Sequence, residues 1–283
     1  MTDRDGGRRG RLVIVGTPIG NLSDLSPRAV RSLSEADVIA CEDTRVTRKL
    51  LSAASVRAPR LMSVRRENEA SLVGAIVRLV EGGATVALVS DAGMPAISDP
   101  GQRVIAAAAD LPVEVVPGPS AVTAALVVSG LDSSRFCFEG FLPRRGAERL
   151  ARLREVAGSR VTAVVFEAPK RVGATLADLA VHCGPERRCA VVCELTKLHE
   201  SVWRGPLGQA GERFAAAELR GEYVIVLEGA PEPPPVDEAT IAASLAASLE
   251  AGLRGRSAVD QVAAGLGVSR RRVYDVLNSR TSA

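Results

Sequence analysis

Aromatic residues and histidine are scarce in this sequence. Phe, Trp and Tyr make up 3% of the 283 residues, and there are two histidines. The hydrophobic core must therefore be built mainly from Ala, Val, Leu and Ile. With 46% hydrophobic and 24% charged residues, the composition is that of a globular protein with a sizeable core. The length predicts about two domains.

Cysteine is present, but not in a metal-binding or disulfide-forming pattern. Five cysteines occur without a CxxC pair, and the shortage of histidine adds to the argument against a zinc site or a disulfide framework. Cys189 and Cys193 lie in RRCAVVCEL, which has the pattern of a strand with both thiols on one face. Small buried thiols are favoured there over a metal or redox role.

Long apolar runs are also missing. No apolar stretch reaches the ~18 residues that a membrane helix needs. The polar start MTDRDGGRRG has no apolar signal region after it. We therefore expect a cytoplasmic protein with no membrane partner.

Positive charge is concentrated at the end of the chain. The formal net charge is +3, but residues 252–283 carry six arginines against Asp260 and Asp275, a net +4, which leaves −1 on all the rest. A basic tail on a near-neutral body suggests an anionic partner such as nucleic acid, although a solvated helix face explains the pattern equally well.

Strand-like and helix-like segments alternate through the first half. Buried apolar stretches such as LVIV and TVALVSD, each followed by a helical pattern, predict an α/β fold with a mostly parallel sheet. The second half has longer strands and a hairpin pattern around Cys193–Gly205, which predicts a mixed sheet. We expect an N-terminal α/β domain at 11–130 and a C-terminal α/β domain at 135–229. A Pro-rich linker at 230–238 then leads to a basic helical tail at 239–283.

The tail contains a short motif of its own. Its segment AVDQVAAGLGVSRRRVYDVL has the helix–Gly turn–helix pattern of small DNA-reading units. Many short helical hairpins share this pattern, so a small accessory helical unit is the favoured interpretation.

Four loops at predicted strand ends carry Gly, Pro and acidic or hydroxyl residues. They are GTPIGNLSD (16–24), CEDTRVTRKLL (41–51), SDAGMPAISDPG (90–101) and PGPSA (117–121). Ligands of open α/β sheets bind outside the carboxyl ends of the strands, so these loops are predicted to form one rim.

The rim does not have the chemistry of a polyphosphate site. There is no GxxxxGK[ST], and no GxGxxG opens a helix. Small residues, carbonyls and a few carboxylates suit a neutral or cationic ligand with ribose hydroxyls. S-adenosylmethionine (SAM) fits this description, and on the residues alone nucleotide and sugar ligands stay open.

The same loops, in the same order, resemble the tetrapyrrole methylase superfamily of SAM-dependent methyltransferases. Further motifs, FEGFLPR, FEAPKR, CELTKLHESVWRG and GEYVIVLEG, resemble its branch of bacterial methyltransferases that act on the ribose 2′-hydroxyl of a decoding-centre cytidine in 16S ribosomal RNA. The resemblance runs from about residue 11 to residue 229. It implies a two-domain fold with SAM in the crevice between the domains, a small-subunit RNA substrate and a homodimer.

The resemblance also implies which residues contact SAM. They come from three rim loops and from two strand ends of the second half: Ile19, Gly20, Asp91, Gly93, Met94, Ile97, Ser120, Ala121, Phe166, Ala168 and Tyr223.

Three carboxylates are candidates for a catalytic base, namely Asp24, Glu42 and Asp43. Each has a structural alternative. Asp24 is placed to cap the helix that starts near Ser26, and Asp43 to cap the next helix or to pair with Arg45. Asp99, in SDPG, is interpreted as part of a helix start.

Cations after strands, and in the tail, are candidates for holding RNA phosphates. They are Arg45, Lys170, Arg171, Arg270 and Arg271. For Lys170 and Arg171 the alternative is a surface pair at a helix start.

The sequence departs from the family pattern in one segment. Relatives often carry histidines where this chain has SVRRENEA, with Arg65 and Glu67, so a histidine role cannot transfer and the arginines are candidate RNA contacts. Two rival functions remain. One is methylation of a small corrin or porphyrin, and the other is DNA-binding regulation through the tail.

Overall fold

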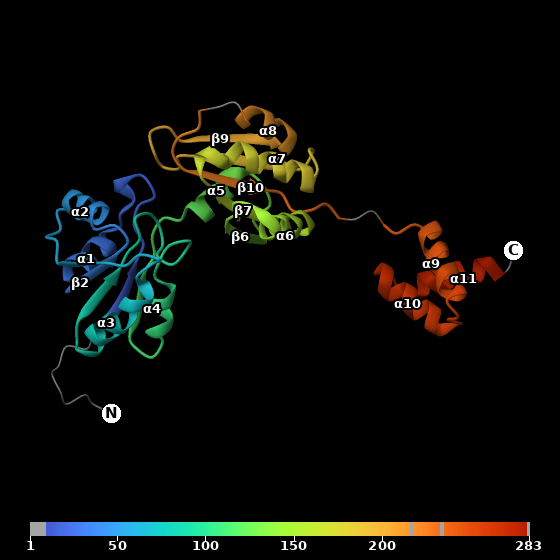
Figure 1. The fold of residues 1–283 in the computed structure, drawn as a ribbon, viewed down its shortest axis with the longest axis horizontal. Helices are drawn as coiled ribbons and strands as arrows, with labels where there is room; N and C mark the ends of the chain where they lie inside the picture. Colours follow the sequence, from blue (N-terminus) through green and yellow to red (C-terminus); the bar gives the residue numbers. More distant parts are fainter. Residues whose placement is uncertain (1–9, 216–217, 233–234, 282–283) are drawn as a thin grey trace. The chain divides into compact units, whose positions relative to one another are not determined.

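The computed structural model describes residues 10–215, 218–232 and 235–281, which fall into two compact units that divide after Ala230 (Figure 1). The first unit holds two five-stranded sheets, and the second is built from helices. Among the helices described, none is long and apolar enough to cross a membrane.

The first sheet has the order β3-β2-β4-β1-β5, with every described strand pair parallel. Its strands are β1 (Arg11–Val15), β2 (Val38–Cys41), β3 (Arg60–Ser63), β4 (Thr85–Leu88) and β5 (Val113–Val116). This confirms the parallel sheet predicted from the apolar runs.

Helices cover both faces of this sheet, as Figure 1 shows. The helices α1 (Pro27–Glu35) and α2 (Thr44–Ala53) lie on one face, and α3 (Glu69–Glu81) and α4 (Gln102–Ala107) lie on the other. Val13 packs in the cluster of Leu33 on α1, whereas its neighbour Leu12 packs in the cluster of Ile76 on α3. Successive strand residues point to opposite faces, so a sheet covered on both sides needs an unbroken apolar run.

The second sheet is mixed, with the order β6-β7-β10-β8-β9. Its strands are β6 (Phe136–Phe141), β7 (Thr162–Glu167), β8 (Arg188–Cys193), β9 (Ser201–Pro206) and β10 (Tyr223–Leu227). Strands β6 and β7 are parallel and the other pairs are antiparallel, including the predicted hairpin of β8 and β9. The sequence-based prediction of a mixed sheet is therefore confirmed.

One face of the second sheet packs on three helices, namely α6 (Gly146–Gly158), α7 (Val172–Cys183) and α8 (Leu207–Ala215). Cys189 lies in that core, where burial raises the pKa of its thiol to about 12, as expected for a small buried thiol. The opposite face packs on α5 (Ala121–Ser129), in a cluster that also contains Ile19 from the loop after β1. This shared cluster joins the two halves of the first unit.

The second unit contains α9 (Glu238–Glu250), α10 (Arg256–Leu266) and α11 (Arg270–Thr281) around a core of its own. Asp237 caps α9 by accepting a hydrogen bond from the Thr240 N–H at 2.7 Å. Gly267, with a φ of 64°, ends α10 in the left-handed conformation and starts the turn to α11. The predicted helical tail is thus a packed three-helix unit.

Candidate active site

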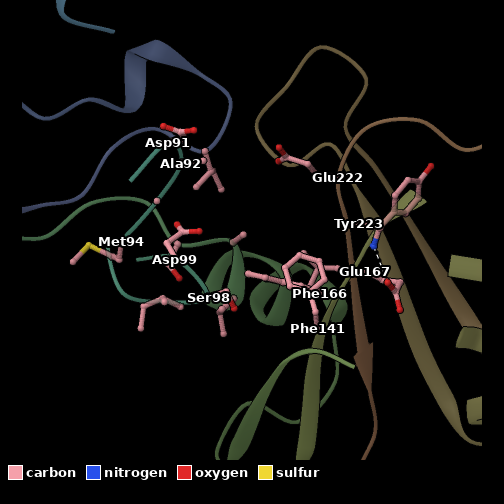
Figure 2. A pocket seen from close by; sticks show the side chains of 18 of the residues that line it. Asp91, Ala92, Met94, Ser98, Asp99, Phe141, Phe166, Glu167, Glu222 and Tyr223 are labelled. Atoms are coloured by element: carbon pink, nitrogen blue, oxygen red, sulfur yellow. Dashed lines mark hydrogen bonds between the residues drawn. The ribbon is translucent and has the colours of Figure 1, made fainter. Parts of the chain in front are cut away.

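A pocket of about 380 Å³ lies between the two sheets of the first unit. Figure 2 shows its two walls, with Asp91, Met94 and Asp99 on one side and Phe166, Glu222 and Tyr223 on the other. The first residues of α5 complete the lining, with Ser120 just before them. The volume is within the range of pockets that hold a small organic ligand.

The pocket lining carries no cationic side chain among the described residues. Carboxylates are present instead, namely Asp91, Asp99, Glu167 and Glu222. The apolar part of the lining includes Ile19, Met94, Ile97, Phe141 and Phe166. This combination is unfavourable for a polyphosphate and suits a ligand that is partly apolar and bears a positive charge.

The loop after β1 is shaped by contacts between backbones. A Cβ on Gly16 would lie 2.6 Å from the Gly118 nitrogen, and a Cβ on Gly118 would lie 2.7 Å from the Gly16 carbonyl carbon. Thr17 and Gly93 exchange backbone hydrogen bonds of 2.9 and 3.2 Å. The two glycines are therefore needed so that three rim loops can meet side by side.

The loop between β4 and α4 has an unusual backbone. Ala96 and Ser98 have φ values of 67° and 65°, and Gly93 and Gly101 have φ values of 82° and 129°. Non-glycine residues rarely adopt positive φ, and such conformations concentrate at ligand-binding sites.

The opposite wall is fixed by a buried carboxylate at the end of β7. Glu167, which is 2% exposed, accepts hydrogen bonds from the Thr175 hydroxyl at 2.6 Å and from the Arg171 guanidinium at 2.9 Å. Arg171 also donates to the Leu142 carbonyl at 2.7 Å. Phe166 packs edge-on against Phe138, with ring centroids 4.8 Å apart.

A second, polar pocket of about 700 Å³ lies beside the first and shares Asp91 and Ser98 with it. Three arginines and four carboxylates contribute to its lining. The complete lining is Glu42, Asp43, Arg45, Arg65, Arg66, Glu67, Asp91, Ser98 and Pro100.

The carboxylates near the shared wall have different proton affinities. Burial, and then the charge of Asp91, raises the pKa of Glu42, and burial also raises the pKa of Asp91. Burial and the Glu42 charge together raise the pKa of Asp99 to about 6. Asp43 behaves in the opposite way, because hydrogen bonds from Arg45 hold its pKa far below the usual value.

Comparison with known proteins identifies the family. A sequence model described as tetrapyrrole (corrin/porphyrin) methylases matches residues 11–211. The chain is 46% identical over 276 residues to ribosomal RNA small subunit methyltransferase I of Mycobacterium tuberculosis, covering 96% of each chain. The chain belongs to the ribosomal RNA small subunit methyltransferase I family of tetrapyrrole methylases. The family protein of Synechocystis is 41% identical and covers 94% of this chain and 97% of its own.

The fold of this methyltransferase family member also matches solved tetrapyrrole methylases. Uroporphyrin-III C-methyltransferase from Thermus thermophilus, solved in complex with S-adenosyl homocysteine, superposes with a TM-score of 0.55 at 22% identity. The match covers 77% of this chain and 97% of the other. It confirms the predicted two-sheet tetrapyrrole methylase fold.

Ten of the eleven residues that the resemblance implied for SAM binding line the first pocket of this methyltransferase. They are Ile19, Asp91, Gly93, Met94, Ile97, Ser120, Ala121, Phe166, Ala168 and Tyr223. Gly20 instead lines a smaller groove, where a Cβ would lie 2.4 Å from the Lys197 Cγ. Gly20 therefore allows the loop after β1 to pack against the loop that follows β8.

The predicted catalytic carboxylates are spread over different places. Glu42 and Asp43 line the polar pocket, together with Arg45. Asp24 ends the short 3-10 helix η1 (Leu22–Asp24) and lines none of the pockets described. It is not the cap of α1, because the Ser26 hydroxyl accepts the Ala29 N–H at 3.1 Å.

The predicted RNA contacts are also separated. Lys170 lines a pocket between α7 and α8, and Arg171 is held by Glu167. In the second unit, Arg270 pairs with Asp260 at 2.8 Å, and Arg271 is exposed in the first turn of α11.

Sequence reasoning missed two acidic residues of the site. From the sequence, Asp99 was interpreted as part of a helix start. For Glu167 the sequence offered only the position of the residue at the end of a strand, which does not indicate a role. The helix does begin nearby, at Gln102, but Glu69 supplies the capping carboxylate and Asp99 faces the pocket.

Proposed function

We propose that this protein is a SAM-dependent methyltransferase that methylates the ribose 2′-hydroxyl of a decoding-centre cytidine in small-subunit (16S) ribosomal RNA. The name of its relatives supports the class of RNA, and the motif resemblance supports the ribose position. The observation that carries the proposal is the pairing of two pockets. A pocket with no cation among its described lining residues lies beside an arginine-lined pocket, and the two share Asp91 and Ser98.

The first pocket suits SAM. Its carboxylates complement the sulfonium and amino groups, its apolar side chains suit the adenine ring and the methylene groups, and backbone groups of the Gly93 loop are available for hydrogen bonds. Ile19, Met94 and Phe166 would hold the cofactor from both walls. When bound, SAM supplies an activated methyl group.

The protein's own contribution is alignment and proton removal. Fixing the acceptor oxygen in line with the methyl carbon can supply much of the rate enhancement. A positioned general base adds roughly 10²–10⁴-fold. Among the predicted bases, Asp43 is held as a weak base by Arg45, whereas Glu42 faces the polar pocket with a raised pKa.

The resemblance also supports a homodimer, because a second copy would extend the RNA-binding surface. Action on ribosomal subunits would place the protein in the cytoplasm. Sedimentation of the purified chain at micromolar concentration checks the dimer directly.

The test of function uses methyl-labelled SAM. The purified protein is incubated with small ribosomal subunits that lack 2′-O-methylcytidine, and in parallel with naked 16S RNA, and the RNA is digested to nucleosides for mass spectrometry. Label on the ribose of cytidine is the expected result. Label on a base of the RNA would overturn the proposal. So would the absence of label from the RNA in an assay in which an added tetrapyrrole is methylated.

A further inference from the structure

The polar pocket is lined by three arginines and four carboxylates, so it offers donors for phosphate oxygens and acceptors for hydroxyl groups. Arg45, Arg65 and Arg66 contribute guanidinium groups, whereas the cofactor pocket beside it has no cation in its described lining. Its volume of about 700 Å³ is sufficient for one nucleotide. Guanidinium groups bind phosphate through paired N–H donors.

Two of these arginines come from a loop that is fixed in place. The Asn68 side chain accepts the Arg65 N–H at 2.7 Å and donates to the Ser63 carbonyl at 3.1 Å, which closes the turn between β3 and α3. Arg66 donates to the Ser98 carbonyl at 3.2 Å, so its guanidinium reaches the wall that the two pockets share. Arg45 differs, because it pairs with Asp43 at 2.5 Å.

Asp99 lines the cofactor pocket, and its sequence neighbours Ser98 and Pro100 both line the polar pocket; it does not cap the helix that follows. Glu69 takes the N–H groups at the start of α4, and the Asp99 side chain lines the cofactor pocket (Figure 2). The groups that act on Asp99 are the Glu42 and Asp91 carboxylates, the Ser90 hydroxyl and the Arg66 guanidinium. With a pKa raised to about 6, Asp99 is mostly ionised at neutral pH and still accepts a proton more readily than an ordinary aspartate.

We propose that the polar pocket binds the acceptor nucleotide, with Arg65 and Arg66 on its phosphates and Asp99 as the catalytic base that receives the 2′-hydroxyl proton. This inference rests on the proposed function and assigns the acceptor side of the same site.

The step balances without any further reactant. The acceptor oxygen forms a bond to the methyl carbon, and the carbon–sulfur bond breaks with its electron pair going to sulfur. The hydroxyl proton passes to an Asp99 carboxylate oxygen. The products are the 2′-O-methyl ribose, the neutral thioether and a protonated Asp99, which releases its proton to water.

A second groove next to the cofactor pocket is the competing route for the acceptor. It has a volume of about 280 Å³, and its cations are Lys49 and Lys197. Lys197 is already paired with Glu194 at 2.8 Å and with Glu222 at 3.1 Å. The polar pocket is larger and has more cations, and its lining residues Ser98 and Pro100 flank Asp99 in the sequence, so the structure favours it.

The phosphate contacts are tested by binding rather than by turnover. Unmethylated small subunits are titrated against the wild-type protein and against Arg65→Ala/Arg66→Ala at several salt concentrations, with S-adenosyl homocysteine present. We expect the double variant to bind on the order of 10-fold more weakly at physiological salt and to lose about 2 from the log–log salt slope. Arg65→Ala alone, which leaves the Arg66 bond to the Ser98 carbonyl in place, should keep its S-adenosyl homocysteine affinity, measured by calorimetry, within about twofold.

The matched control is Lys49→Ala, which alters the competing groove. We expect it to keep the wild-type salt slope to within a few tenths. Loss of affinity in Lys49→Ala with none in the arginine variant would overturn the assignment of the pocket.

The base is tested by the pH dependence of kcat/KM. In the wild type, activity should fall as pH drops through about 6, because protonated Asp99 cannot accept a proton. Asp99→Asn should lower kcat by roughly 10²–10⁴-fold and abolish this acid limb, while S-adenosyl homocysteine still binds. Glu42→Gln should keep the limb but move it to lower pH, because the Glu42 charge helps to raise the pKa of Asp99. A limb that survives in Asp99→Asn, or is lost in Glu42→Gln instead, would refute the role of Asp99.

The two levels of the proposal fail differently. A wild-type protein that labels no RNA rejects the proposed function, and the acceptor site with it. Labelling by the wild type, with unchanged binding and pH profiles in the variants, rejects only the acceptor site.

Discussion

Glu69 caps helix α4 from another helix, since its Oε1 accepts the Gly101 N–H at 3.0 Å. The same oxygen accepts the Arg103 N–H at 2.8 Å, and Glu69 is 6% exposed at the first turn of α3. The bond crosses from α3 to the end of the loop that lines the proposed cofactor pocket. It therefore connects the packing of the sheet to the shape of the site.

Removing this cap should affect both stability and ligand binding. Glu69→Ala leaves two N–H groups without their acceptor, so we expect the free energy of unfolding to fall by about 1–3 kcal/mol. The affinity for S-adenosyl homocysteine should fall as well, because the loop at 93–101 loses its anchor. Denaturant unfolding and calorimetry measure the two effects. Glu81→Ala, on the exposed last turn of the same helix, is the control and should change stability by less than about 0.5 kcal/mol.

Arg171 should act through stability and not through RNA. It pairs with buried Glu167, so Arg171→Ala leaves a buried carboxylate without its cation and should cost about 2–3 kcal/mol of unfolding free energy. The neighbouring Lys170 is exposed, and Lys170→Ala should be neutral within about 0.5 kcal/mol. Thermal unfolding of the two variants separates them. Equal stability with weaker RNA binding in Arg171→Ala would restore the phosphate role.

Gly93 should be required for cofactor binding, because a side chain there would crowd the pocket lining. Its φ is 82°, and a Cβ there would lie 3.3 Å from the Ile19 side chain, which lines the pocket. Gly93→Ala should therefore lower the affinity for S-adenosyl homocysteine, measured by calorimetry, in addition to a backbone strain of about 1–2 kcal/mol.

The control for this strain is Gly184→Ala, after α7. Gly184 also has a positive φ, of 92°, with nothing within 4 Å of the added Cβ, so alanine there is strained without meeting a pocket residue. It should lose stability and keep its affinity. If both variants bind S-adenosyl homocysteine as the wild type does, the pocket is not the cofactor site.

The strands and rim loops could be predicted because their signals are local. VIAC in β2 and TVAL in β4 are buried at every position, which matches their unbroken apolar sequence. The loops that follow parallel strands necessarily meet at one edge of the sheet. Seven of the implied ligand contacts come from these loops and line one pocket, and Phe166, Ala168 and Tyr223 line it from the ends of β7 and β10.

The residue roles that the sequence did not predict depend on contacts with residues far away in the chain. Asp99 was interpreted as part of a helix start because Glu69, thirty residues earlier, gave no sign of capping α4. Gly16 has the appearance of a ligand-loop glycine, but the close approach of Gly118 explains it. Arg171 was a candidate phosphate contact with a surface pair as the alternative, whereas in the structure buried Glu167 holds it. Local patterns carry no information about such contacts.

The helical tail should contribute to RNA affinity and not to cofactor binding. It has its own buried core, including Ile241, Val259 and Val273, so truncation after Ala230 should leave the first unit folded. The truncated chain should bind S-adenosyl homocysteine with unchanged affinity by calorimetry. It should bind small subunits more weakly, with a log–log salt slope reduced by about 2 if Arg270 and Arg271 each neutralise one phosphate.

The full-length variant Arg270→Ala/Arg271→Ala separates the effect of the two positive charges from the effect of removing the whole helical tail. It should reproduce most of the loss in the salt slope while keeping the helices, because both side chains are exposed. Arg270 should contribute less than Arg271, since it must give up its pairing with Asp260 to reach a phosphate. A truncated chain that binds subunits as tightly as the intact one, with the same salt dependence, would show that the tail's positive charge serves only to keep its surface solvated.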